Sequence, residues 1–289
     1  GACSLLHAAG TGYGASIALD LPIIVKALDR PSKRQLEDSD GVLPAVVDAW
    51  VSNGLALPEG LEANDIHWAV ASKIPQNRGL KSSAALSVAG IKALCEATNT
   101  DLSDFEIVSL SSQAQMNAGV SITGSIDDSW ACLTKGWRLI NANAEDIESG
   151  VVMSGPGPNP DDWIVLIAAR DERKSRPELE NFAPLFQEFE KALIALQQGE
   201  ILNCLTINGR AVCSVTNDLQ GRRIANDAFI NGARASGVTG SGPAVVIIIP
   251  SLVRSSAERI KSALSRLMSS DQIIETKFLS LDTDELEIE

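Results

Sequence analysis

Residues able to do chemistry gather at positions 75–85, which read PQNRGLKSSAA and lead into an alanine-rich run. Gly79 lets the backbone approach a ligand, and Lys81 adds a mobile positive charge. The hydroxyls of Ser82 and Ser83 can bind phosphate or a phosphate-bound Mg²⁺. The first turn of a helix leaves N–H groups unpaired at the positive end of the helix dipole, where an anion binds. The segment therefore predicts a phosphate-binding loop.

Two other readings of this loop fit less well. A Walker A loop requires G-x-x-x-x-G-K-[ST], whereas Lys81 stands between Leu80 and Ser82. A simple helix N-cap built from the two serines is the plainer alternative, because serine is a favoured capping residue. Capping gives no reason for a glycine and a lysine immediately before the serines, so the binding loop is favoured.

The composition of the 289 residues describes a globular protein with an excess of acidic groups. Apolar residues make up 45 % and charged residues 21 %, and the length suits two lobes that share an interface. The net charge of −13 argues against a nucleic acid as partner, because duplex binding depends on cationic side chains. An anion such as ATP then needs a local positive pocket, which Arg78 and Lys81 supply.

Neither a membrane nor a disulfide framework is expected. No apolar run has the length needed to cross a bilayer, and the first residues lack the basic and apolar regions of a signal peptide. The five cysteines are odd in number and contain no C-x-x-C pair, which favours reduced thiols in a cytoplasmic protein. Cys95 and Cys132 stand among apolar residues and are expected to be small core residues.

Turn residues and hydrophobic spacing predict alternating strands and helices. In the first half we expect strands on both sides of the glycine-rich residues 10–14, a helix over 42–51, a strand over 66–74 and a long helix over 82–98. Ser103 and Glu106 have the spacing of a capping box, so the next helix begins there.

A domain boundary is expected at residues 155–158, where glycine and proline alternate. Beyond it, strands are predicted over 163–169, 244–249 and 273–280, and helices over 178–198, 200–218, 222–230 and 255–269. The division gives an N-terminal domain of residues 1–154 and a C-terminal domain of residues 155–289.

Three glycine-bearing segments, at residues 10–14, 79–83 and 237–242, stand in the order found in the GHMP family of small-molecule kinases. Residues 75–85 resemble the ATP-phosphate loop of that family, P-x-x-x-G-L-[GK]-S-S-A, and residues 237–244 resemble its C-terminal motif. The resemblance covers nearly the whole chain. It implies an α+β, two-lobe fold with an N-terminal βαβ nucleotide-binding domain and a C-terminal ferredoxin-like α/β domain.

Within this family the sequence is most similar to the archaeal type of shikimate kinase. The run RGLKSS at residues 78–83 matches that group, and residues 119–128 resemble its V-[ST]-x-T-G-[AS]-x-D-D segment. Residues 12–16, with Asp20 and Leu21, resemble its first motif. The implied reaction is ATP-dependent phosphorylation of a shikimate hydroxyl, giving shikimate 3-phosphate and ADP in aromatic amino acid biosynthesis.

The resemblance also implies roles for individual residues. Asp127 would orient or deprotonate the substrate hydroxyl and Lys81 would neutralise the transferring group, with ATP and Mg²⁺ required. Ser82 and Ser83 are the expected metal-binding residues, whereas Asp128 is read as part of a helix cap. The implied nucleotide-binding residues are Pro75, Asn77, Arg78, Gly79, Leu80, Lys81, Ser82, Ser83, Ala84 and Ala85, and the implied substrate-binding residues are Gly12, Gly14, Asp20, Thr239, Gly240, Ser241 and Gly242.

Two positions depart from the pattern of the family. Tyr13 stands where many members have a lysine, and Gln113 and Gln115 occupy the stretch in which mevalonate kinases place a Mg²⁺-binding glutamate. An amide oxygen binds Mg²⁺ more weakly than a carboxylate, so the ion would depend on serines, nucleotide and water. Two alternatives therefore stay open: another acceptor, such as homoserine or mevalonate, or a catalytically silent nucleotide-binding protein.

The acceptor carboxylate of shikimate calls for a cation, and arginine suits it best because its planar fork binds both oxygens. Asn208 and Arg210 draw attention because they form a polar break in an apolar helical region. His7 and His67 lack a carboxylate or metal-ligand partner nearby in the sequence and are read as structural. The candidate cations are Arg170, Lys174, Arg176, Arg210 and Arg234.

Overall fold

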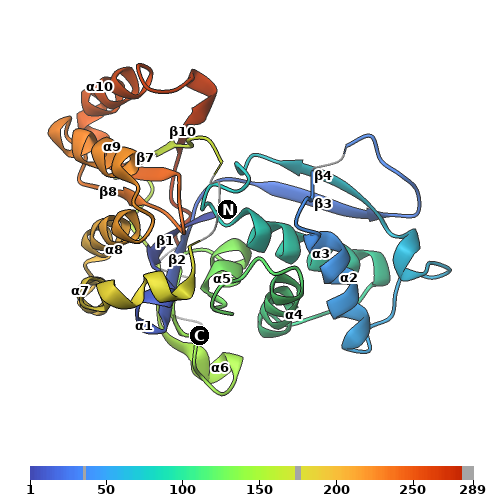
Figure 1. The fold of residues 1–289 in the computed structure, drawn as a ribbon. Coiled ribbons are helices and arrows are strands. Elements are labelled where there is room, and N and C mark those ends of the chain that lie inside the picture. The colour runs from blue at the N-terminus through green and yellow to red at the C-terminus, as the bar shows by residue number, and fades with distance from the viewer. Residues whose placement is uncertain (35–36, 173–176, 282–289) are drawn as a thin grey trace.

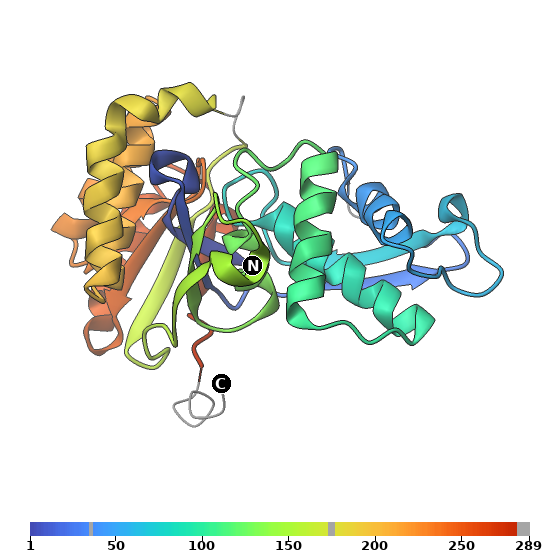
Figure 2. The same cartoon turned by 90° about the horizontal axis from the view of Figure 1, so that it is seen from below.

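The structure is a computed structural model that describes residues 1–34, 37–172 and 177–281. Figure 1 shows two lobes, one with helices α7 to α10 and the other with helices α2 to α4, with α5 between them. The view from below in Figure 2 shows the same separation of the lobes. In the described part of the chain, no helix has the length and apolar character needed to cross a bilayer.

An antiparallel sheet of four strands holds the N-terminus of the chain. Its order is β1 (Ala2–Leu6), β2 (Tyr13–Ala18), β5 (Trp137–Asn141) and β6 (Val151–Gly155). The expected glycine-rich turn between the first two strands contains a short helix, α1 (Ala8–Thr11), which ends at Gly12 with φ +80°. Glycine adopts this left-handed conformation without the steric cost of a Cβ, so the chain can turn back into β2.

The second lobe packs helices on a two-stranded ribbon. Strands β3 (Ile23–Leu28) and β4 (His67–Ser72) pair antiparallel, and α2 (Val42–Ser52), α3 (Ser82–Thr98) and α4 (Asp104–Asn117) accompany them. Trp50 is fully buried in the core between the helices. Helix α3 has the predicted bounds. Before α4, Ser103 Oγ accepts a hydrogen bond from Glu106 N at 3.3 Å while Glu106 Oε2 accepts one from Ser103 N at 2.7 Å, which confirms the capping box.

The C-terminal half is a ferredoxin-like α/β unit, as predicted. Its antiparallel sheet has the order β10 (Ile273–Thr276), β7 (Trp163–Ala168), β9 (Val245–Pro250) and β8 (Ala235–Val238). Helices α7 (Phe186–Gln197), α8 (Ile201–Val215) and α9 (Leu219–Ile230) connect β7 to β8, and α10 (Arg254–Leu264) connects β9 to β10. Strand, helix, strand, strand, helix, strand is the succession that defines this fold.

Several element predictions need correction. The helix expected over 178–198 begins as two 3₁₀ turns, Leu179–Asn181 and Ala183–Leu185, because Pro184 interrupts the helical hydrogen bonds. The strand expected over 273–280 ends at Thr276. Strands β3, β5, β6 and β8 and the short helix α6 (Ile147–Gly150) had no prediction of their own, and α5 (Asp127–Leu133) was expected only through the helix cap assigned to Asp128.

One hydrophobic core extends across the proposed domain boundary. Its buried residues include Leu5 and Ile17 of the first sheet as well as Leu166 and Phe189 of the C-terminal half. Strand β1 contacts α8 directly, because the Cys204 thiol lies 3.1 Å from Leu5 O. The division into residues 1–154 and 155–289 stays a prediction, and the first strand is packed against elements from both sides of it.

Candidate active site

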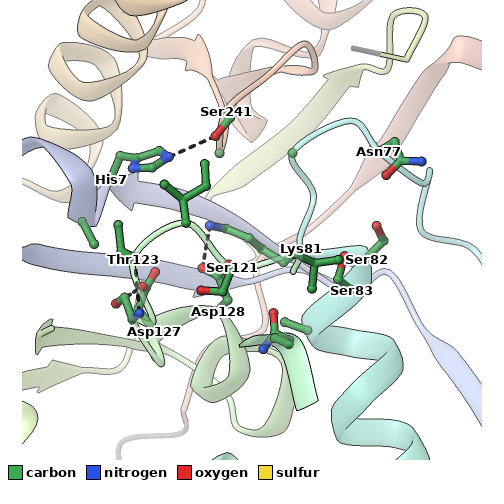
Figure 3. A pocket seen from close by; sticks show the side chains of 18 residues that line it. His7, Asn77, Lys81, Ser82, Ser83, Ser121, Thr123, Asp127, Asp128 and Ser241 are labelled. Carbon is green, nitrogen blue, oxygen red and sulfur yellow. Dashed lines mark hydrogen bonds and ion pairs between the residues drawn. The ribbon is translucent and has the colours of Figure 1, made fainter. Parts of the chain in front are cut away.

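A cavity between the lobes is lined by two of the three glycine-bearing segments that the sequence singled out, residues 79–83 and 237–242, and by His7 and Ala8 just before the first of them. Figure 3 shows side chains from the phosphate loop, the start of α1, the start of α5 and the turn after β8 around one space. The lining includes Ser82 and Ser83 on one side and His7, Ser241 and Asp127 on the others. Residues that are more than 200 positions apart in sequence thus form one site.

The phosphate loop has the backbone of a binding turn. Asn77, Gly79 and Lys81 all have positive φ, at 55°, 84° and 63°, so the loop curls tightly before α3. Lys81 is the N-cap and makes no side-chain capping bond, and the first helical bond runs from Ala85 N to Lys81 O at 2.9 Å. The N–H groups of residues 82–84 therefore have no acceptor within the helix. Neither serine caps the helix, so the alternative of a serine N-cap is wrong.

Gly79 is needed because the turn after β8 presses against it. A Cβ at Gly79 would lie 2.1 Å from Thr239 O, and a Cβ at Gly240 would lie 2.9 Å from Gly79 Cα. The Thr239 hydroxyl donates to Gly79 O at 3.1 Å and accepts from Ser4 N at 2.9 Å. Thr239, predicted to bind substrate, supports the phosphate loop from behind, whereas Gly240 and Ser241, which carry the same prediction, line the cavity.

Two carboxylates and a lysine form the charged centre of the cavity. Asp127 is 4 % exposed, and its two oxygens accept hydrogen bonds from Ser125 Oγ at 2.5 Å and Ser16 Oγ at 2.6 Å. Lys81 Nζ lies 2.6 Å from Asp128 Oδ1. Gly14, another predicted substrate residue, makes room for this group, because a Cβ there would lie 2.4 Å from Asp127 Oδ1.

Burial and mutual charge set the protonation of these groups. Burial, together with the charge of Asp128, raises the pKa of Asp127 to about 7, although Lys81 and the two hydroxyls act in the opposite direction. Burial opposes the charge of Lys81, but the two carboxylates outweigh it and raise the lysine pKa. For Asp128, burial favours the neutral acid, and the neighbouring Lys81 outweighs it and lowers the pKa. Near neutral pH an ion pair thus lies beside an aspartate able to exchange a proton.

Asp128 is a residue that sequence reasoning placed wrongly. It was expected to belong to a helix cap, yet the N-cap of α5 is Ile126, and Asp128 is the second helical residue, with its carboxylate on Lys81. The sequence did contain a signal for this pairing. A buried lysine needs a carboxylate partner, and Asp128 is an acid within a motif that the sequence had already assigned to the site.

His7 is a second residue whose place was missed, since it was read as structural. It is the N-cap of α1, and its Nδ1 accepts from Ala9 N at 3.2 Å. An accepting Nδ1 carries no proton, so Nε2 is protonated and donates to Ser241 Oγ at 3.1 Å. The His7 amide donates to Asn208 Oδ1 at 2.9 Å, which accounts for the polar break in α8. The ring faces the cavity.

Of the two glutamines in the expected metal position, only Gln115 lies in the site. Its side chain is 6 % exposed, and Nε2 donates to Ser111 Oγ at 3.3 Å and Ser129 Oγ at 3.0 Å. Gln113 is turned to the outside, where its side chain bonds Asn53. The described residues contain no group of three or more histidines, cysteines or acids able to hold a metal ion.

Several predicted site residues lie away from the cavity. Arg78 Nη1 donates to Ala169 O at 3.0 Å, Leu80 is fully buried, and Asp20 is exposed at the far end of β2. None of these three residues lines the described part of the cavity. The same holds for Pro75, Ala85, Gly12 and Gly242.

The candidate cations for a substrate carboxylate are placed elsewhere. Arg170 is buried, forms an ion pair with Asp218 and donates to Pro243 O at 2.8 Å, so it is structural. Arg210 and Arg234 line a different cavity, and Lys174 and Arg176 lie outside the described residues. His67 is in the β3–β4 ribbon. Among the described residues, Lys81 is the one lysine or arginine that lines the site.

The cysteines do not contribute a nucleophile to the site. Cys95 and Cys132 pack against the hydrophobic cores, which confirms the prediction for them. The Cys132 thiol lies 3.8 Å from Lys81 O, directly under the loop, and burial raises its pKa to about 11. A protonated thiol is a poor nucleophile, so the chemistry rests on oxygen and nitrogen groups.

Comparisons with known proteins agree with this geometry. Residues 50–136 match the family described as GHMP kinases N terminal domain, a stretch that holds both the phosphate loop and Asp127. The shikimate kinase of Methanocella arvoryzae is 31 % identical over 218 residues, covering 72 % of this chain and 70 % of the relative. The shikimate kinase of Methanothermobacter thermautotrophicus is 24 % identical over 253 residues, covering 86 % and 84 %.

Solved structures share the fold over almost the entire chain. The mevalonate kinase of Methanococcus jannaschii has a TM-score of 0.66 at 18 % identity, covering 97 % of this chain and 96 % of its own. The galactokinase of Lactococcus lactis, complexed with galactose, has a TM-score of 0.73 at 12 % identity, covering 97 % and 92 %. The chain therefore belongs to the GHMP family of small-molecule kinases and is similar to the archaeal shikimate kinases.

Proposed function

We propose that this kinase transfers the γ-phosphoryl group of ATP to a hydroxyl of shikimate. The observation that carries the proposal is the position of Asp127, a buried carboxyl with a pKa of about 7, in the same cavity as the unpaired N-terminus of α3. Phosphoryl transfer requires charge-stabilising donors on one side and a group that receives the hydroxyl proton on the other. The cavity offers both.

The N-terminus of α3 is the proposed site of the transferred phosphate. The free N–H groups of residues 82–84 and the ammonium of Lys81 are donors for phosphate oxygens. A smaller cavity on the other side of the loop shares Asn77, Ser82 and Ser83 and continues to residues 37–42. The phosphate loop therefore borders both spaces.

The serine hydroxyls are the residues that fit Mg²⁺. The ion prefers oxygen ligands and keeps several waters, so two hydroxyls beside the phosphates are compatible with it. When bound, Mg²⁺ would neutralise charge on the phosphate oxygens. The protein supplies the remaining positive charge through Lys81, which Asp128 holds in place at 2.6 Å.

Asp127 is the proposed general base. Its carboxylate would receive the proton of the attacking hydroxyl, while Ser16 and Ser125 hold both carboxylate oxygens in position. The remaining lining offers hydroxyls of Ser121, Thr123 and Ser241 for a polyol. The choice of shikimate among polyols comes from the relatives that carry this name, and mevalonate and homoserine are the competing acceptors.

Release of ADP by the purified chain in the presence of Mg²⁺ tests the proposal, with shikimate, mevalonate and homoserine offered separately. We expect turnover with shikimate, identification of shikimate 3-phosphate by mass spectrometry, and at least a hundredfold preference over the other two acceptors. Turnover with homoserine or mevalonate alone would overturn the acceptor. ATP binding without transfer to any of them would make the chain a silent nucleotide-binding protein.

A further inference from the structure

A second large cavity lies at the opposite end of strand β8 from the active site. Arg234 directly precedes β8, and Gly240 and Ser241 follow its other end, so about 13 Å of strand separates the two places. Trp163, at the start of β7, pairs with Pro250 at the end of β9 and lines the same cavity. The described linings of this cavity and of the active site have no residue in common.

One face of α8 forms the floor of this second cavity. Asn203, Thr206 and Arg210 all line it, and their spacing of three and seven residues places them on the same side of a helix. Asn208 lies on another side, where it accepts the hydrogen bond from the His7 amide. The helix therefore presents different polar groups to the two cavities.

Two arginines in this cavity lack an anionic partner. Arg210 and Arg234 are exposed, and within the described residues neither forms an ion pair, whereas Arg170 and Arg254 each pair with an acid. The acid in the lining, Glu200, accepts a hydrogen bond from Asn203 at 2.7 Å. Guanidinium groups of this kind bind carboxylates and phosphates through two hydrogen bonds.

Flat apolar surfaces accompany the two charges. The Arg210 guanidinium lies 5.7 Å from the centre of the Phe229 ring, and the half-buried Trp163 and Leu202 supply further apolar lining. The cavity measures about 770 Å³. That is within the roughly 300–1,000 Å³ of small-molecule sites, which combine apolar walls with a few polar groups.

We propose that this arginine cavity, defined by Trp163, Thr206, Arg210, Phe229 and Arg234, binds a small organic anion: a carboxylate or phosphate attached to a flat ring. The arginines bind the anionic group, and the ring lies against the aromatic side chains. The side-chain amide of Asn203 and the hydroxyl of Thr206 can form hydrogen bonds with further oxygens of the ligand. This site is independent of the phosphoryl acceptor, so its test needs no catalytic activity.

Calorimetric titration of the full chain with benzoate and with phenyl phosphate tests the proposal. We expect both probes to bind, and the tighter of the two identifies carboxylate or phosphate as the preferred group. Arg210→Gln and Arg234→Gln should each lower the affinity at least tenfold, as expected for loss of a hydrogen bond between charged groups. Arg223→Gln, an exposed arginine on the same helix as Phe229, is the matched control and should leave the affinity unchanged.

Two further measurements distinguish the arginine cavity from the active site. Ligand binding should change tryptophan fluorescence, and Trp163→Phe should remove that change while calorimetry still detects binding. Lys81→Met should have no effect on the titration. Binding that is lost in Lys81→Met and retained in both arginine variants would overturn the proposal, as would the absence of binding by either probe at millimolar concentration.

Discussion

At the residue scale, Asp127 is a carboxyl surrounded by protein and held by two hydroxyls. Only its ionised form can take a proton from an acceptor. Because its pKa is raised to about 7, we expect turnover at saturating substrates to rise as pH increases from 5 to 8, with its midpoint near 7. The pH dependence of kcat measures this, and a profile that is flat across that interval would contradict the role of Asp127 as base.

The same raised pKa has a cost in stability. The unfolded chain loses this proton near the ordinary value of 3.8, well before the folded chain does, so the fold loses stability as pH rises through the interval up to about 7. A shift of one pKa unit corresponds to about 1.4 kcal/mol. Asp127→Asn should therefore raise the free energy of unfolding at pH 8 by more than about 1 kcal/mol and change it little at pH 4. Urea denaturation at pH 4 and at pH 8 measures this difference. An equal change in the free energy of unfolding at the two pH values would show that ionisation of Asp127 does not destabilise the fold.

Lys81 and Asp128 offer a way to separate charge from structure. Lys81→Met should lower kcat by about 10²- to 10³-fold, as for loss of one preorganised electrostatic donor, and should also destabilise the fold because Asp128 is left unpaired. Adding Asp128→Asn should restore stability without restoring turnover. Recovery of both in the double variant would show that the lysine acts only through folding.

At the scale of elements, the phosphate loop and α3 were predictable because their information is local. A glycine turn, a lysine and an alanine-rich apolar run of 17 residues specify that junction without reference to the rest of the chain. The partner of Lys81 and the place of His7 were not predictable in this way. Asp128 is the second residue of a helix of only seven residues, and His7 caps a helix of four. Neither helix is long enough for a hydrophobic period to predict how these side chains are oriented.

The contact between the loop and the turn after β8 leads to a prediction with an internal control. Gly79 and Gly54 have similar positive φ, 84° and 76°, but only Gly79 would bring a Cβ into contact, whereas the space around Gly54 is open. Gly54→Ala should cost about 1 kcal/mol of stability for the left-handed backbone alone. Gly79→Ala should cost clearly more and weaken nucleotide binding. Equal melting temperatures for the two variants would argue against the close approach.

At the scale of the whole molecule, one core connects the halves that the sequence divides at residues 155–158. Strand β1 is hydrogen-bonded to β2 on one edge and packs on α8, where Cys204 approaches Leu5 O. A fragment of residues 1–154 would leave that surface exposed to water. We expect such a fragment to lack a cooperative thermal unfolding transition by circular dichroism, in contrast to the full chain. A sharp transition in the fragment would establish an independent N-terminal domain.

The packing of β1 against α8 also affects how the protein is made. A ribosome releases residues 2–6 about 200 residues before the helix that covers them, at Ile201–Val215, has been synthesised. During that interval the apolar face of the strand has no final partner, and contacts so distant in sequence close slowly. Synthesis in cells therefore depends on keeping an early strand from associating with other chains until late helices arrive. The strand concerned, β1, is also the segment that positions His7 in the active site.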